Sequence, residues 1–128
     1  MDAYKKIIIG SDNSHFKNIK NATVLELQPH KKLIEYMKKS KLLLYPSIND
    51  ANPNTVREAV YNKCLVLISN NIGYYEIFPE YSVCTSYNKN EWLDKSIYLI
   101  SNYDKIIASQ KLEFNSGESI IDFINNFL

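Results

Sequence analysis

The sequence predicts an α/β fold in which a parallel β-sheet is flanked by helices. Short apolar runs alternate along the 128 residues with stretches whose apolar residues recur at helical spacing. Such alternation of strand and helix is typical of βαβ units, and these units build parallel sheets. A chain of this length is expected to form one domain, residues 1–128, that buries roughly two-thirds of its unfolded surface.

The first half is expected to hold three strands and two helices. Lys5–Gly10 is an apolar run closed by a glycine, and Asn21–Leu27 is a weaker strand with alternating polarity. His30–Lys39 carries its apolar residues on one helical face. Leu42–Tyr45 is a continuous apolar run stopped by a proline, which predicts a buried strand. Asn54–Asn62 is predicted to be a short helix.

The second half continues the alternation. Cys64–Ser69 is another buried strand, and the glycine-containing turn after it leads into one or two helical turns at Tyr74–Phe78. Tyr81–Thr85 is rich in strand-forming residues. A helical stripe then runs from Trp92 to Ile100, and the helical pattern continues from Tyr103 to Leu112. A last helix is expected after Ser116, which is a plausible N-cap.

Composition excludes several classes of function. The net charge is only +1, so sequence-independent electrostatic binding to nucleic acid or anionic lipid is not expected. Cys64 and Cys84 both lie in apolar runs, which predicts buried free thiols in a reducing, cytoplasmic environment rather than a disulfide or a metal site. No secretory signal is visible, and no apolar run is long enough for a transmembrane segment.

Two carboxylates, Asp50 and Glu58, stand on either side of a predicted helix start. They follow the strand that ends at Tyr45, and ligands of parallel sheets bind beyond the carboxyl ends of the strands. Carboxylates accept hydrogen bonds from sugar hydroxyl groups. Their pattern therefore predicts a site for a ligand that carries hydroxyl groups.

The helix start between the two acids predicts an anion site. Asn52 is expected to be the N-cap and Pro53 the first helical residue, because both residue types are favoured there. The backbone N–H groups of Asn54 and Thr55 are then unpaired and, with the helix dipole, attract phosphate. Glu58 follows Asn54 by four residues, about 6 Å farther along at ~1.5 Å per residue. That separation suits the phosphates and the ribose of a nucleotide sugar.

The segment from Pro46 to Ala59 resembles the donor-binding motif of GT-B glycosyltransferases of the glycogen synthase/family 4 type. Pro46-Ser47, Asp50 and Glu58-Ala59 match that motif in order and spacing. The strand Cys64–Ser69 and the stretch Ile72–Glu76 resemble the family's next strand, glycine turn and helix start. The resemblance covers about residues 5 to 100 and implies a Rossmann-like sheet, as in a shortened GT-B C-terminal domain.

The resemblance also implies residue roles and chemistry. It implies transfer of a hexosyl group from a nucleoside-diphosphate sugar, without a metal or a further cofactor. It implies that Asp50 contacts the donor sugar and Glu58 the ribose hydroxyl groups, the pair we take as catalytic. Backbone phosphate contacts are implied at Asn54 and Thr55. Base contacts are implied near two further residues, Gln28 and His30.

The sequence departs from the family pattern in three places. Asp50 stands where glutamate is usual, and Ala51-Asn52 replaces the glycine before the helix. The strand–helix unit that carries a basic pair for the diphosphate is not matched, and neither is the acceptor-binding domain. We therefore expect transfer only when a partner domain or subunit supplies the acceptor half. Arg57, the single arginine, adjoins Glu58 and is expected to be a surface cation that points elsewhere on the helix.

Two other functions remain open from the sequence. The first is a non-catalytic remnant that acts as a nucleotide-binding or interaction module, for which the apolar stripe Ile120–Leu128 could dock on a partner. The second is a phosphoacceptor receiver domain, although its strand at Leu42–Tyr45 ends in Pro46-Ser47 where a receiver needs an aspartate. His15 is expected to be an exposed loop residue, and most of the ten tyrosines are expected to be packing residues.

Overall fold

The structure, a computed structural model, describes residues 4–9 and 18–114, with side chains as far as residue 109. The chain divides into two compact units, Met1–Glu35 and Tyr36–Leu128, and each is described by itself. The single domain expected from the length stays a prediction. Gly10, His15, the helix expected after Ser116 and the stripe at its end lie outside the described residues.

The first unit contains two strands that the sequence predicts. Strand β1 (Lys6–Ile9) pairs in parallel with β2 (Ala22–Leu25), with Lys6 opposite Ala22 and Ile9 opposite Leu25. Helix α1 (His30–Lys39) has the bounds that its apolar periodicity predicts, and it continues into the second unit.

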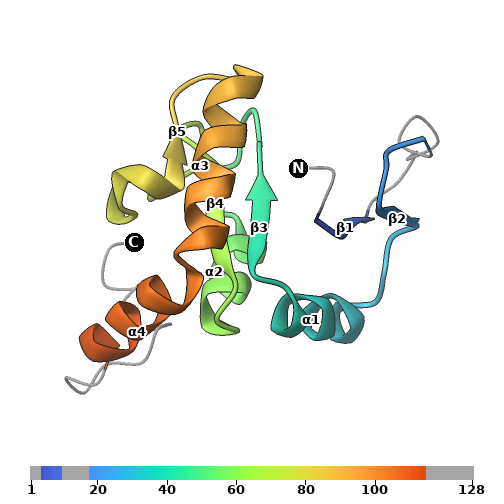
Figure 1. Cartoon of the computed structure of the whole chain (residues 1–128), viewed down its shortest axis with the longest axis horizontal. Coiled ribbons are helices and arrows are strands. Elements are labelled where there is room, and N and C mark those ends of the chain that lie inside the picture. Colours follow the sequence, from blue (N-terminus) through green and yellow to red (C-terminus); the bar gives the residue numbers. More distant parts are fainter. Residues whose placement is uncertain (1–3, 10–17, 115–128) are drawn as a thin grey trace. The chain divides into compact units, whose positions relative to one another are not determined.

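The second unit is built on a parallel sheet of three strands in the order β3-β4-β5 (Figure 1). The strands are β3 (Leu42–Tyr45), β4 (Leu65–Ser69) and β5 (Val83–Cys84). Every residue of β4 is buried, as its apolar run predicts for a strand with a neighbour on each side. Strand β5 is shorter than the predicted Tyr81–Thr85 because Glu80–Ser82 turns as a 3₁₀ helix, η3.

Strand β3 corrects one prediction. Its apolar run predicts a buried strand, yet among the described residues it pairs only with β4, and Leu44 is 44% exposed. The other three residues of β3 are half-buried. The composition of a strand reports how apolar its faces are, whereas its place in the sheet depends on partners elsewhere in the chain.

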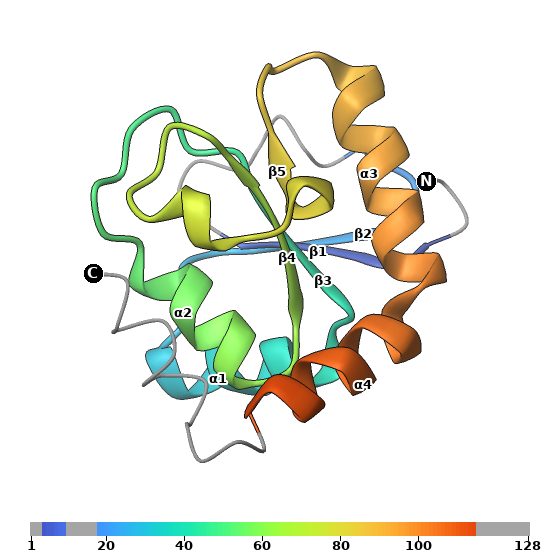
Figure 2. The same ribbon diagram turned by 90° about the vertical axis from the view of Figure 1, so that its left-hand side faces the viewer.

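Helices cover both faces of the second unit's sheet. Helix α2 (Asn54–Tyr61) and helix α3 (Lys89–Ser101) both contact β4, and Figure 2 shows them on either side of it. The α3 side is filled by Leu65 and Leu67 from β4 with Leu99, Cys84 and Ile106, the last from α4 (Tyr103–Phe114). Alternate side chains of β4 face opposite ways, so residues 66 and 68 are left for the α2 side. The predicted α/β class, with parallel strands flanked by helices, is confirmed.

Candidate functional site

The loop between β3 and α2 lies against the segment that follows β4 (Figure 2). Asp50 forms an isolated parallel bridge with Ile72. The Gly73 N–H donates to the Asp50 carbonyl over 2.8 Å, and the Asp50 N–H donates to the Asn71 carbonyl over 3.4 Å. The backbone of the first predicted catalytic acid is therefore fixed by a neighbour more than twenty residues away.

A second set of contacts holds the start of this loop. The carbonyl of Ser47 accepts hydrogen bonds from the Ser69 hydroxyl at 2.5 Å and from the Tyr87 hydroxyl at 2.8 Å. Asn71 donates through Nδ2 to the same Tyr87 hydroxyl at 2.8 Å. Ser69 ends β4 and Tyr87 follows β5, so the contacts gather at the carboxyl ends of neighbouring parallel strands, where ligands of such sheets bind.

Gly73 permits the close approach of the two segments. A Cβ atom at this position would lie 1.8 Å from the carbonyl oxygen of Ala51 and 2.7 Å from its carbonyl carbon. Both are backbone atoms that cannot rotate away. The predicted glycine turn is therefore required by contact with the site loop.

The Asp50 carboxylate is held within its own loop. Tyr45, the last residue of β3, donates its hydroxyl to Oδ2 at 2.8 Å, and the Asn52 N–H donates to Oδ1 at 3.1 Å. Burial, and then the bond to Asp50, raise the pKa of Tyr45 to about 12, so its hydroxyl remains a donor at neutral pH. A carboxylate has about four acceptor positions, and two stay available after these bonds.

Helix α2 starts at Asn54, where the predicted range begins, but its cap differs from the prediction. Pro53 is the N-cap, with φ −74° and ψ 105°, so Asn52 is not the cap and Pro53 is not the first helical residue. The Pro53 carbonyl accepts the Tyr74 hydroxyl at 2.5 Å, which holds this residue in its extended conformation. The start has no side-chain cap hydrogen bond. Asn54 and Thr55 are the first two helical residues, so their N–H groups have no acceptor within the helix.

Arg57 also differs from its prediction. Its guanidinium reaches back to the start of α2, where Nη1 donates to Asn54 Oδ1 at 3.2 Å and Nη2 donates to Asn52 Oδ1. The group lies 5.2 Å from the centre of the Tyr74 ring. The expectation of a surface cation that points elsewhere is wrong, because two amide oxygens and an aromatic face draw the side chain toward the site loop.

The second predicted acid, Glu58, lies on α2 in the turn that follows Asn54. Its side chain is half-buried, and the neighbouring Ala59 is fully buried. The roles of Asp50 and Glu58 on a sugar and a ribose stay predictions, as do the phosphate contacts at Asn54 and Thr55.

The predicted base contacts belong to the first unit. Gln28 is half-buried and donates through Nε2 to the Glu26 carbonyl at 2.9 Å. His30 is exposed and is the first residue of α1. The boundary at Glu35 separates both residues from Asp50 and Glu58, so their part in base binding stays a prediction.

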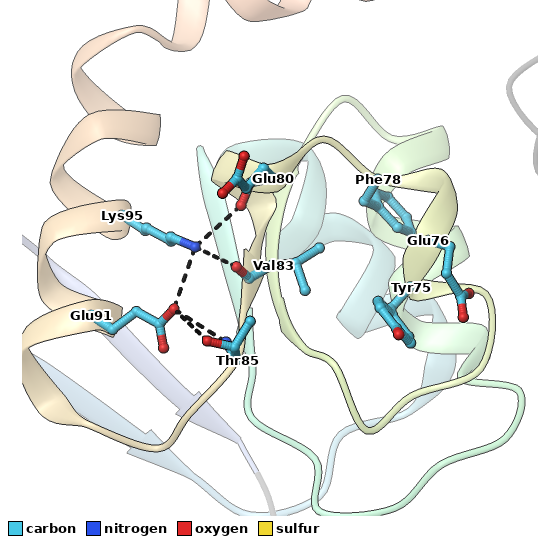
Figure 3. Close-up of a pocket in the computed structure, with 8 residues that line it drawn as sticks. All are labelled: Tyr75, Glu76, Phe78, Glu80, Val83, Thr85, Glu91 and Lys95. Atoms are coloured by element: carbon cyan, nitrogen blue, oxygen red, sulfur yellow. Dashed lines mark hydrogen bonds and ion pairs between the residues drawn. The ribbon is translucent and has the colours of Figure 1, made fainter.

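A separate hollow of about 340 Å³ lies between η2 (Tyr75–Ile77), β5 and α3 (Figure 3). None of its lining residues belongs to the segment 46–59. Glu91 accepts from the backbone and hydroxyl groups of Thr85 and Ser86, and Lys95 donates to the Val83 carbonyl and lies 3.4 Å from Glu91. Glu91 and Lys95 are thus occupied by each other and by neighbouring backbone and hydroxyl groups, which indicates a structural role for this pair.

The tyrosine hydroxyl groups are the part of the site that sequence reasoning missed. Tyr45, Tyr74 and Tyr87 each donate to the loop that carries Asp50 or to its end at Pro53. The position of Tyr45 directly before Pro46 is a signal that could have found it, since that place is a strand end. The other two contacts join residues 21 and 40 positions apart, for which the sequence offers no local signal.

Both cysteines are buried and free, as predicted. Burial raises the pKa of Cys64 to about 12 and that of Cys84 to about 11, so neither is a reactive thiolate at neutral pH. Among the residues whose side chains the structure describes, no three His, Cys, Asp or Glu are grouped as metal ligands would be. No helix in the same part of the chain has the length and apolar character needed to cross a membrane.

Comparison with known proteins gives one family. Searches of curated proteins and of solved structures found no match. The family model described as Glycosyl transferases group 1 matches residues 4–116, which include the whole β3–α2 loop, both predicted acids and the turn at Gly73. Since that match spans most of the sequence, the chain belongs to the Glycosyl transferases group 1 family.

Proposed function

We propose that this chain is the donor-binding part of a GT-B glycosyltransferase. It binds a nucleoside-diphosphate sugar and transfers the hexosyl group when a partner domain or subunit holds the acceptor. The observation that carries the proposal is the geometry of the loop from Pro46 to Pro53, which lies within the part of the chain that the family model matches. Backbone hydrogen bonds fix this loop at the carboxyl ends of β3 and β4. The loop carries Asp50 and leads into a helix start that has no side-chain cap hydrogen bond.

The start of α2 is the proposed place of the diphosphate. The N–H groups of Asn54 and Thr55 and the positive end of the helix dipole attract phosphate oxygens. During transfer, the bond between the anomeric carbon and the diphosphate oxygen breaks and the electron pair leaves with the diphosphate. The acceptor hydroxyl oxygen bonds to that carbon, and the departing diphosphate takes up its proton. The helix start stabilises the charge that develops on the departing oxygen.

The two acids are proposed to orient the sugars on either side. Asp50 uses its two remaining acceptor positions for hydroxyl groups of the donor sugar, while Tyr45 keeps the carboxylate in one orientation. Glu58 accepts the ribose hydroxyl groups one turn into α2. Gln28 and His30 are proposed near the nucleobase. A metal is not required by this assignment.

Isothermal titration of the full chain with UDP, GDP and their sugar derivatives tests the proposal. We expect Glu58→Gln to weaken binding of the preferred nucleoside diphosphate by about tenfold or more, since a charged hydrogen bond is lost. Asp50→Asn should weaken binding of the sugar derivative more than that of the diphosphate alone. Asp94→Asn is the matched control, because Asp94 is exposed on α3 and the substitution removes the same charge.

Failure of the chain to bind any nucleoside diphosphate would overturn the proposal. Binding that resists both Glu58→Gln and Asp50→Asn would remove the assigned site. Binding of the nucleotide alone, with no preference for any sugar derivative, would favour the non-catalytic module that the sequence leaves open.

A further inference from the structure

Arg57 occupies an unusual electrostatic position. Its guanidinium lies beside the N-terminal end of its own helix, hydrogen-bonded to the amide oxygens of Asn52 and Asn54. The positive end of a helix dipole disfavours a cation. The sequence nevertheless places its single arginine, among fourteen lysines, where it folds back to this end.

The partners of Arg57 are all uncharged. They are two amide oxygens and the face of the Tyr74 ring, and none of the ion pairs found among the described residues involves Arg57. Its Nε atom is buried and has no hydrogen-bond partner in the described part of the chain. Asp50 is the acid of the same loop, and its carboxylate is bonded to Tyr45 and Asn52 instead. The helix start therefore carries an uncompensated positive charge in addition to its dipole.

Tyr74, whose ring lies against Arg57, is held in place by its backbone and by its hydroxyl group. Tyr74 has a left-handed backbone conformation with φ 52°, and it follows Gly73, which touches the backbone of Ala51. The Tyr74 ring is buried and its hydroxyl is bonded to Pro53, the N-cap of α2. The guanidinium lies over this ring, 5.2 Å from its centre, and beside the first helical residues. A planar guanidinium with fixed orientation suits paired phosphate oxygens.

We propose that Arg57 is the residue that neutralises the diphosphate at the start of α2. The guanidinium exchanges an amide oxygen of Asn52 or Asn54 for a phosphate oxygen and stays over the Tyr74 ring. It then offsets the charge left on the diphosphate when the sugar departs. This inference rests on the proposed function, and it assigns to Arg57 a contact that the two acids and the backbone N–H groups do not supply.

The test compares ligands that differ only in phosphate number. Isothermal titration measures the dissociation constants of a nucleoside, its monophosphate and its diphosphate for wild type, Arg57→Gln and Arg57→Lys. We expect Arg57→Gln to weaken binding of the diphosphate by about tenfold or more and binding of the nucleoside by less than about twofold. Arg57→Lys keeps the charge but loses the paired N–H donors of the planar guanidinium. Its diphosphate affinity should therefore fall between those of wild type and Arg57→Gln.

Lys63→Asn is the matched control. It removes one positive charge just beyond the opposite end of α2, and asparagine accepts the left-handed backbone conformation found there, with φ 61°. Its affinities should equal those of wild type. Thermal unfolding of each variant is measured in parallel.

Each outcome decides between a phosphate contact and a purely structural role. If Arg57→Gln weakens binding of the nucleoside and of the diphosphate equally, or weakens neither, the inference is overturned while the proposed function stands. If Arg57→Gln does not fold, an unchanged ratio of diphosphate to nucleoside affinity in Arg57→Lys overturns it instead. A wild-type chain that binds no nucleoside diphosphate removes the inference and the proposed function together.

Discussion

Replacing Gly73 with alanine tests how closely the site loop is packed. The new Cβ atom would lie 1.8 Å from the Ala51 carbonyl oxygen, whereas ordinary contacts of this kind exceed about 3 Å. The two backbone segments must therefore separate by more than one ångström. That movement breaks the bond of 2.8 Å from the Gly73 N–H to the Asp50 carbonyl.

The expected cost follows from these two effects. Overpacking of a well-filled contact destabilises by about 1–3 kcal/mol, and the lost hydrogen bond adds about 1 kcal/mol. We expect the free energy of unfolding to fall by about 2–4 kcal/mol, equivalent to roughly 10 °C in the melting temperature. Urea unfolding followed by circular dichroism measures the change.

The double variant Ala51→Gly/Gly73→Ala provides the control. The clashing atoms are backbone atoms of Ala51, so removing its side chain should restore nothing. A Gly73→Ala protein whose stability stays within about 0.5 kcal/mol of wild type would refute the packing argument. Full rescue by Ala51→Gly would show that side chains, and not the backbone, set the approach.

Two further substitutions probe the hydrogen bonds around the sheet end. Glu91→Gln tests the network at the start of α3. Burial alone raises the pKa of Glu91, but bonds from Thr85, Ser86 and Lys95 outweigh it and lower the pKa from 4.5 to about 2. The stabilisation is therefore present above pH 4.5 and lost as pH falls toward 2. Because Glu91 is only half-buried and solvent screens its interactions, we expect a contribution of only about 1 kcal/mol, seen as a flatter acid limb in thermal melts from pH 2 to 7. An identical acid limb would contradict this. Tyr45→Phe should lower the free energy of unfolding by about 1 kcal/mol. In titrations it should weaken binding of the sugar derivative more than binding of the diphosphate. Equal weakening of binding for both ligands would count against positioning of Asp50 by Tyr45.

The elements of the fold could be predicted because their signals are local. Alternating apolar runs and helical stripes gave five strands and the helices α1 to α4 in the described part of the chain, with boundaries within a few residues. The position of β3 could not be predicted in the same way. A run of four apolar residues is equally compatible with a central and an edge strand, since the partners lie elsewhere in the sequence.

The candidate site was predictable as a segment but not as a set of contacts. The spacing of Asp50 and Glu58 in the sequence marks the loop and helix that the structure places at the end of the sheet. The fold-back of Arg57 was also within reach of local reasoning, because Asn54 lies three residues earlier on the same helical face. The interpretation of the tyrosines as packing residues overlooked their hydroxyl groups, which bond to backbone atoms far away in sequence.

These contacts change how the two acids should be tested. The Asp50 carboxylate already joins Tyr45 to Asn52, so it holds the shape of the loop as well as facing any ligand. Asp50→Asn keeps the side-chain shape but replaces one acceptor oxygen by a donor, which opposes either the Tyr45 hydroxyl or the Asn52 N–H. A loss of binding in that variant therefore combines loop distortion with a lost ligand contact. Only a loss that exceeds the effect of Tyr45→Phe, at equal stability, assigns Asp50 a direct part in holding the sugar.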